Sequence, residues 1–312
     1  MSEAVAVETP TAPANAYVAA FRMMRDIIAN DRKAKIGASI LVVLVIVSII
    51  GPSVAPFDVE QPEIAIRCCV GETSGAPSLI HPMGVDHLGR DLFSRIISGL
   101  TVSLLVATGA VVIAVIIGVP LGAFAGYAGG WVDTVIMRIM DAIIAMPGRL
   151  LAIALVAAIG PSIGALWFAI SFGSIPRYAR LIRGGVLAQR EREYVEAARA
   201  IGEGSGSTLF RYVLPNAMAP VLVQITLNFP SAITAEASLS FLGLGLVPPI
   251  ISWGQMLSAA QPYLEVAPWL AIFPGLALTA LIMGFVLLGD ALRDHLDPRY
   301  HGRRRAPKKV SA

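Results

Sequence analysis

Residues 96–132 read IISGLTVSLLVATGAVVIAVIIGVPLGAFAGYAGGWV and carry no charged side chain. A helix rises 1.5 Å per residue and needs about 20 apolar residues to cross a hydrocarbon core of roughly 30 Å. These 37 residues are therefore long enough to cross a membrane as a helix, with length left over. Residues 40–50 also form a run that does not alternate between polar and apolar residues, whereas transmembrane β-strands do alternate. The stretches predict an all-α membrane protein.

The composition of the whole chain agrees with that class. Of its 312 residues, 56% are hydrophobic and 14% are charged, and the mean hydropathy is +0.72. A soluble domain has about 25% charged residues, and disordered chains are also rich in charge. We therefore expect an integral membrane protein, whose net charge of +3 reflects orientation rather than nucleic-acid binding. Charge-poor stretches predict six transmembrane helices, near residues 34–55, 98–126, 134–158, 163–188, 217–243 and 267–290.

The distribution of Lys and Arg predicts the orientation of these helices. Segment 1–35 has five basic residues, segment 177–211 has seven, and the tail 290–312 has seven, which together make 19 of the 24. Segment 56–95 has only three, against six acidic residues. Because basic residues concentrate on the cytoplasmic side, both termini and segment 177–211 are expected in the cytoplasm. The loop 56–95 and the stretch 244–266 are then expected outside.

The cytoplasmic segment contains a short polar helix between two predicted membrane helices. Arg, Glu and Ala dominate residues 189–201 and favour a helix. Gly202 then ends the helix, and Pro215 restarts the chain at the membrane, where a first helical turn tolerates proline. A short helix of this kind can transmit a movement to the membrane helices if a partner protein binds it. A solvated loop with balanced charges is the alternative that the composition leaves open.

Glu236 is the only acidic residue between Arg211 and Glu265. At 1.5 Å per residue, it lies roughly 27 Å along a helix counted from Met218, close to the outer face. An ionisable side chain in a span is a candidate for function. A structural carboxylate that binds the neighbouring serines or a basic residue is the alternative.

Three glycines, Gly118, Gly122 and Gly126, recur every four residues in the second predicted span. Helices in lipid associate through close packing, and small residues at this spacing let two backbones approach. We expect these glycines to pack against another helix of the same chain.

Enzyme motifs are absent from the sequence. Residues 160–164 match the pattern G-x-S-x-G, but the stretch joins two predicted membrane helices, whereas that motif requires a strand–turn–helix. The glycines of residues 202–206 are not followed by the Lys-Ser/Thr of a phosphate-binding loop. Cys68 and Cys69 are adjacent, and no spacing resembles a zinc site. We expect no catalytic residue, no metal site and no ATP hydrolysis by this chain.

The segment that begins Glu196-Ala197-Ala198 and continues through Gly202 to Leu214-Pro215 resembles the EAA loop of bacterial ABC-type importer permeases. Tyr212 departs from that pattern, since the family usually has Ile there. The resemblance implies that the segment forms a coupling helix, which docks into a groove of a separate ATPase subunit. The residues that it assigns to ATPase coupling are Tyr194, Glu196, Ala197, Ala198, Gly202, Leu214 and Pro215.

Four further segments narrow the resemblance to the C-type permease subunit of dipeptide, oligopeptide and nickel importers. They are residues 81–95, 126–133, 236–245 and 289–299, in the order of that subunit, and the similarity runs from about residue 20 to 300. The resemblance implies a type I ABC importer permease fold. It divides the chain into a partly disordered cytoplasmic segment 1–33, a first transmembrane helix 34–55, an extracytoplasmic loop 56–97, a five-helix core 98–290 with the coupling loop at 189–216, and a basic cytoplasmic tail 291–312.

One departure from the family concerns the third span, where this chain has Met146-Pro147-Gly148-Arg149 instead of Phe-Pro followed by small or apolar residues. An arginine is costly inside a bilayer, so Arg149 is expected to face a cavity or the interface. It joins Glu236 and Ser240 as a candidate for the pathway or its gate. The candidates for docking of an extracytoplasmic binding protein are Asp86, Arg90, Asp91 and Trp253.

The resemblance implies that the chain moves di- or oligopeptides across the bacterial plasma membrane by alternating access. Its implied partners are a second, homologous permease, two ATP-binding subunits and a substrate-binding protein. ATP and Mg would be bound by the ATP-binding subunits, and this chain would hold no cofactor. Nickel or another small solute is an alternative cargo, and a secondary transporter is an alternative of another class.

Overall fold

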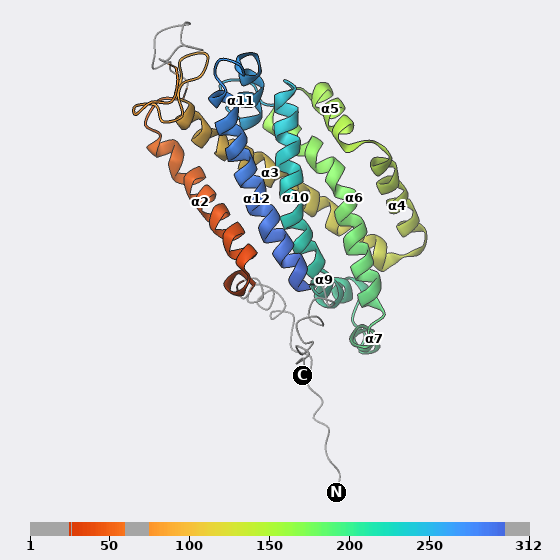
Figure 1. Ribbon diagram of the computed structural model, residues 1–312. Helices are drawn as coiled ribbons and strands as arrows, with labels where there is room; N and C mark the ends of the chain where they lie inside the picture. The colour runs from red at the N-terminus through yellow and green to blue at the C-terminus, as the bar shows by residue number, and fades with distance from the viewer. Residues whose placement is uncertain (1–24, 26, 60–74, 297–312) are drawn as a thin grey trace, which may run out of the picture.

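The computed structural model describes residue 25, residues 27–59 and residues 75–296. Residues 1–24, the pair Cys68 and Cys69, and the arginines at 303–305 lie outside them. The described chain is helical, with a single isolated bridge between Val85 and Asp91 (Figure 1). Its elements are α2 (Arg32–Val54), α3 (Leu92–Ala128), α4 (Gly130–Ala145), α5 (Gly148–Ile159), α6 (Ile163–Arg190), α7 (Glu193–Ala200), α8 (Ser205–Ser207), the π-helix η1 (Thr208–Val213), α9 (Leu214–Ala217), α10 (Ala219–Phe241), α11 (Trp253–Ala260), the 3-10 helix η2 (Gln261–Tyr263) and α12 (Trp269–Leu296).

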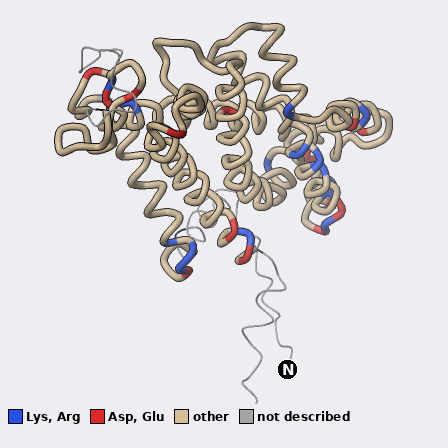
Figure 2. The backbone as a smooth tube through the Cα atoms, turned by 45° about the horizontal axis from the view of Figure 1, so that its top comes forward, with Lys and Arg blue, Asp and Glu red and all other residues tan. Residues whose placement is uncertain are grey.

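The helices form one bundle with two distinct ends. In Figure 1, α2 and α12 lie side by side at one edge, α10 and α6 occupy the middle, and α4 and α5 form the opposite edge. The short helix α7 projects from one end, and α11 lies at the other. Figure 2 shows the charged residues gathered near the ends, while the long helices between them are mostly uncharged. This distribution is the one that a bilayer imposes on a bundle that crosses it.

Each of the six expected spans overlaps one helix or one bent pair of helices in the structure. Helices α2, α3 and α12 are each long and apolar enough to cross a membrane. Counting two bent helix pairs as single spans raises the number of candidates to five. Helix α6 covers the fourth expected span but is not among these candidates. The described helices therefore give three to five candidate spans, and the count of six stays a prediction.

The third expected span, residues 134–158, is not one straight helix. Helices α4 and α5 meet at an angle of 89°. Pro147 lies at the break, and the residue before a proline is pushed towards extended backbone. Met146 has that conformation, with ψ at 134°. The bend brings the first turn of α5, with Arg149, beside α6 and α10.

Side-chain caps explain where several helices begin. Asp31 accepts hydrogen bonds from the amides of Lys33 and Ala34 before α2, and Asp91 accepts one from Ser94 before α3. Ser252 forms a reciprocal capping box with Gln255 at the start of α11. These short polar side chains satisfy amides that would otherwise lack a helical partner.

The three glycines of α3 pack against α6, as their spacing predicted. A Cβ atom at Gly118 would lie 2.8 Å from the Ile175 carbonyl oxygen, and one at Gly126 would lie 2.9 Å from that of Arg183. A Cβ at Gly122 would meet the Ala179 carbonyl group even more closely. The two backbones thus touch along the interface, which only glycine permits.

Candidate functional site

Helix α7 presents two different faces. Val195 and Ala198, three residues apart, are 0% and 4% exposed and pack inward. Glu196 and Ala197 lie between them and are exposed. The helix therefore has a buried face that attaches it to the bundle and an exposed face that is open to a partner. Of the two alanines expected to permit close docking, only Ala197 is at the surface.

Three interactions attach α7 and the end of α6 to their surroundings. The Tyr194 hydroxyl donates to the side-chain oxygen of Gln189 at 2.8 Å, and burial raises the pKa of this hydroxyl. The Arg199 guanidinium lies 5.7 Å from the ring centroid of Tyr127, and Arg190 donates to the Gly126 carbonyl oxygen at 3.0 Å. Arg199 thus connects α7 to the last turn of α3, and Arg190 connects the end of α6 to the same turn.

A glycine cap ends α7. Gly202 has φ at +86°, and the amide of Glu203 reaches back to the Ala198 carbonyl at 3.1 Å. This is the left-handed helix end that glycine adopts without steric cost. The chain then continues through η1 into α9, where Leu214 and Pro215 are half-buried.

Two exposed apolar residues near α7 escaped the sequence analysis. Ile201 is 79% exposed and Phe210 is 65% exposed. A large apolar side chain in a charge-rich loop is the signal that could have identified them.

Ion pairs join α4 to α6 along the part of the bundle nearest α7. Arg183 binds both carboxylate oxygens of Asp133, at 2.5 and 2.6 Å, and Arg180 pairs with Asp141 at 2.5 Å. The predicted span 163–188 already included Arg180 and Arg183, although both were also counted with the basic segment 177–211. In the structure α6 extends to Arg190, so the exposed loop begins only after it.

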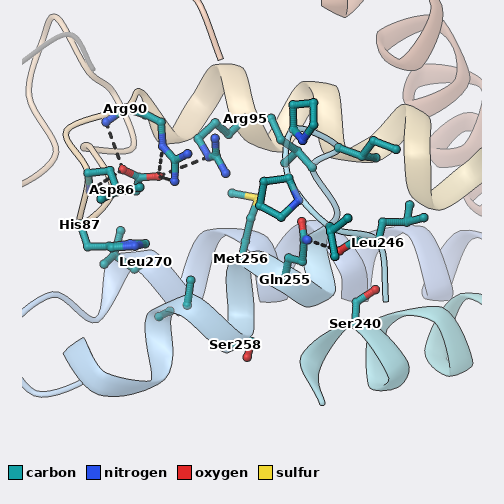
Figure 3. A pocket seen from close by; sticks show the side chains of 18 of the residues that line it. Asp86, His87, Arg90, Arg95, Ser240, Leu246, Gln255, Met256, Ser258 and Leu270 are labelled. Carbon is teal, nitrogen blue, oxygen red and sulfur yellow. Dashed lines mark hydrogen bonds and ion pairs between the residues drawn. The ribbon is translucent and has the colours of Figure 1, made fainter. Parts of the chain in front are cut away.

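The expected docking residues have structural roles in the loop before α3. The Asp86 carboxylate accepts hydrogen bonds from the Leu88 and Arg90 amides and from the Arg90 side chain, at 2.8, 3.1 and 2.8 Å. Figure 3 shows this carboxylate paired with both Arg90 and Arg95. The side chain of Arg90 is only 18% exposed.

Asp91 and Trp253 are buried more deeply still. Asp91 is 0% exposed, caps α3 and lies 2.9 Å from Nδ1 of His81. Trp253 is 1% exposed, and its indole N–H donates to the Ile96 carbonyl at 2.9 Å. Both side chains therefore make their contacts within the chain, and their role in docking stays a prediction.

A cavity of about 830 Å³ opens beside this loop (Figure 3). Its walls come from the loop, from the segment after α10 and from α11. His87 lines this cavity and stacks on Tyr263, with ring centroids 5.4 Å apart. Burial lowers the pKa of His87. The charge of Asp86 raises this pKa, whereas the charges of Arg90 and Arg95 lower it further. Exposed Leu88 and Val247 lie at the same cavity.

Glu236 is fully buried beneath this cavity. The Ser240 hydroxyl donates to one of its carboxyl oxygens at 2.8 Å, and the Ser103 hydroxyl donates to the other at 3.3 Å. Ser240 itself lines the cavity. Of the two roles that the sequence left open for Glu236, these contacts favour the structural one, which links α10 to α3.

A second cavity, of about 540 Å³, lies between α5, α6 and α10. Arg149 lines it, so the three pathway candidates do not form one site, because Ser240 lies at the other cavity. Arg177 of α6 also lines it and was not predicted as a site residue. An arginine midway along a predicted span was the signal that could have identified it. Within the described ranges, no group of three or more His, Cys, Asp or Glu could hold a metal ion.

A comparison with known protein families identifies the family of this chain. Residues 118–302 match the family model described as the binding-protein-dependent transport system inner membrane component. The chain belongs to this family. Its members are permease components of ABC importers, which confirms the resemblance carried by the EAA segment and removes the secondary transporter as an alternative.

Curated relatives cover most of the chain. A dipeptide transport system permease protein of Alkalihalophilus pseudofirmus is 45% identical over 223 residues, which are 72% of this chain and 73% of the relative. A glutathione transport system permease protein of Pectobacterium atrosepticum is 45% identical over 223 residues, covering 72% and 74%. One from Escherichia coli O157:H7 is 42% identical over 273 residues, covering 88% of each chain.

Two solved structures share the fold of this permease. An inward-facing methionine ABC transporter superposes with a TM-score of 0.53 at 16% identity, over 64% of this chain and 95% of the solved chain. An amino acid ABC transporter with histidines superposes with a TM-score of 0.50 at 19% identity, over 65% and 95%. At such identities the likeness concerns the fold alone, which is the type I ABC importer permease fold.

Proposed function

We propose that this permease moves di- or oligopeptides inward across the bacterial plasma membrane by alternating access, as one half of a heterodimer. Support for the cargo comes from relatives 42–45% identical whose names specify dipeptide and glutathione transport. The other half is a second, homologous permease. Two ATP-binding subunits hold ATP and Mg, and a substrate-binding protein delivers the peptide outside, while this chain binds no cofactor of its own.

The proposed topology has six spans with both termini in the cytoplasm. It assigns residues 1–33 and 291–312 to the cytoplasm, residues 34–55 to the first span, and residues 56–97 to the outside. Residues 98–290 form the five-helix core. The 3.7 Å pair between Lys33 and Asp294 supports this arrangement, because it holds the start of α2 and the end of α12 together at the end that carries α7.

The observation that carries the proposal is the exposed face of α7 on an anchored helix. Within the coupling loop 189–216, Glu196 and Ala197 are available to an ATPase subunit, while Val195 and Ala198 hold the helix to the bundle. A pull on α7 would reach α3 through Arg199 and Arg190, and would reach α4 through the ion pairs of α6. Tyr194 and Leu214 pack against the apolar cluster that contains Val195, and Pro215 follows Leu214 at the start of α9.

The proposal also assigns the docking of the binding protein to the outer surface around the cavity of Figure 3. Exposed Leu88 and Val247, which line this cavity, are the residues offered for this contact. Asp86, Arg90, Asp91 and Trp253 contribute by holding the shape of that surface.

A crosslinking experiment in intact cells tests the coupling role. Ala197→Cys is expected to crosslink to an ATP-binding subunit through a short bifunctional reagent. Ala198→Cys is the matched control, because the neighbouring residue on the same helix is only 4% exposed and should give no product. Equal products from both variants, or none from Ala197→Cys in a transporter that is active, would refute the docking of α7.

A further inference from the structure

The cavity between α5, α6 and α10 is lined by two arginines from different helices. Arg149 lies in the first turn of α5, and Arg177 lies midway along the 28-residue α6. No aspartate or glutamate is among the described residues that line this cavity. Its wall is therefore cationic, although the helices around it are mostly apolar.

Neither arginine is neutralised by an acidic side chain of the described chain. Arg177 donates to the side-chain oxygen of Asn228 at 3.3 Å, which carries no charge, and Arg149 has no hydrogen bond or ion pair among the described residues. The arginines nearer α7 differ from these two, since Arg180 and Arg183 are paired with Asp141 and Asp133. Arg180 and Arg183 therefore join α6 to α4 through ion pairs, whereas the charges of Arg149 and Arg177 stay available to a ligand.

An unpaired guanidinium at membrane depth requires a physical reason. It is costly in hydrocarbon and is tolerated where it faces a water-filled cavity or a partner. Guanidinium groups present several N–H donors in a planar fork that matches a carboxylate. The remainder of the wall suits the rest of a small organic molecule, since it combines alkyl groups such as Ile153 with the exposed hydroxyl of Ser231.

We infer that this cavity is an anion subsite in which Arg149 and Arg177 bind a carboxylate of the cargo during its passage. The inference rests on the proposed function, because it takes a peptide as the cargo, and it names the chemical group that the permease itself recognises. It also separates the two cargoes left open by the sequence. A cationic wall attracts the carboxylate of a peptide and repels a free nickel ion.

The charge of the cavity is tested first, without any substrate. In the assembled importer with Cys68→Ser and Cys69→Ser, Ser231→Cys places a reporter thiol at the cavity. We expect anionic sulfonatoethyl methanethiosulfonate to label it roughly tenfold faster than the cationic trimethylammonioethyl reagent. Arg149→Gln and Arg177→Gln should each reduce that ratio about fivefold. Arg138→Gln, an exposed arginine of α4 outside the cavity, should leave it unchanged.

The transport role is tested with dialanine and a saturating amount of its loaded binding protein. Arg149→Gln and Arg177→Gln are expected to lower uptake about tenfold, since a charge-assisted hydrogen bond is lost. Arg149→Lys should retain most of the uptake, and Arg138→Gln should retain all of it. Immunoblotting of membranes verifies that each variant is inserted.

The outcomes keep the two proposals apart. Failure of the wild-type importer to take up dialanine would refute peptide transport, whereas the labelling ratio still reports the charge of the cavity. Equal labelling by the two reagents, no labelling by either, or wild-type uptake by both Gln variants would overturn the anion subsite while leaving peptide transport intact.

Discussion

Replacing Gly122 by alanine tests how tightly α3 must approach α6. A Cβ atom at this position would lie 2.6 Å from Cγ2 of Ile182, and closer still to the Ala179 carbonyl oxygen. Real Cβ atoms keep at least 3.0 Å, so the helices must separate by 0.4 Å or more at Ile182 and by more at the carbonyl. Overpacking of this kind costs about 1–3 kcal/mol.

The matched control is Gly184→Ala on α6. Nothing lies within 4 Å of a Cβ atom there, so this change only gains helix propensity, about 1 kcal/mol. Because both variants exchange glycine for alanine inside a helix, the propensity gain cancels in the comparison. The difference between them is the overpacking cost of Gly122→Ala.

The assay is unfolding of the purified chain in detergent, followed by tryptophan fluorescence during a titration with SDS. We expect Gly122→Ala to be less stable than Gly184→Ala by about 1–3 kcal/mol. A Gly122→Ala variant as stable as Gly184→Ala would show that α3 and α6 separate freely, and would refute the close backbone contact.

Three other perturbations follow from the same contacts. Gly202→Ala places a side chain at φ +86°, which costs about 1–2 kcal/mol and strains the end of α7. In the reconstituted transporter this variant should raise the number of ATP molecules hydrolysed per peptide imported. The control Gly204→Ala should leave this ratio unchanged. Asp91→Ala removes the cap of α3 and the partner of buried His81, so SDS unfolding should show a loss of about 2 kcal/mol or more, while Asp91→Asn retains the cap and loses less. The pKa of His87 in the folded chain lies below its ordinary value of 6.5, so the unfolded chain binds more protons. The free energy of unfolding should therefore fall as the pH drops through 6.5 towards that lower pKa. His87→Gln should flatten this part of the plot of stability against pH.

Local patterns in the sequence were sufficient for much of the fold. The charge-free runs identified the helical membrane class, and the glycines at 118, 122 and 126 identified a packing face. The polar helix at 189–201 was predicted from helix formers followed by Gly202, and α7 lies inside that range. Each of these features depends on composition or spacing over one or two helical turns.

Other features were beyond such patterns. The bend of 89° within residues 134–158 depends on how α5 packs after Pro147, and a proline in a span does not specify the angle. Asp86 and Asp91 looked like surface carboxylates because they lie in a charged loop, yet the loop folds back and buries both.

The chain's membrane class, the approximate extent of its helices and its membership of the permease family can all be inferred from the amino-acid order, because bilayer crossing and motif spacing are local properties. Side-chain partnership is different. Arg183 meets Asp133 across 50 residues, and Arg149 shares a cavity with Arg177 from another helix. Which charges are neutralised and which remain available depends on which helices become neighbours, and that follows only from packing the whole bundle.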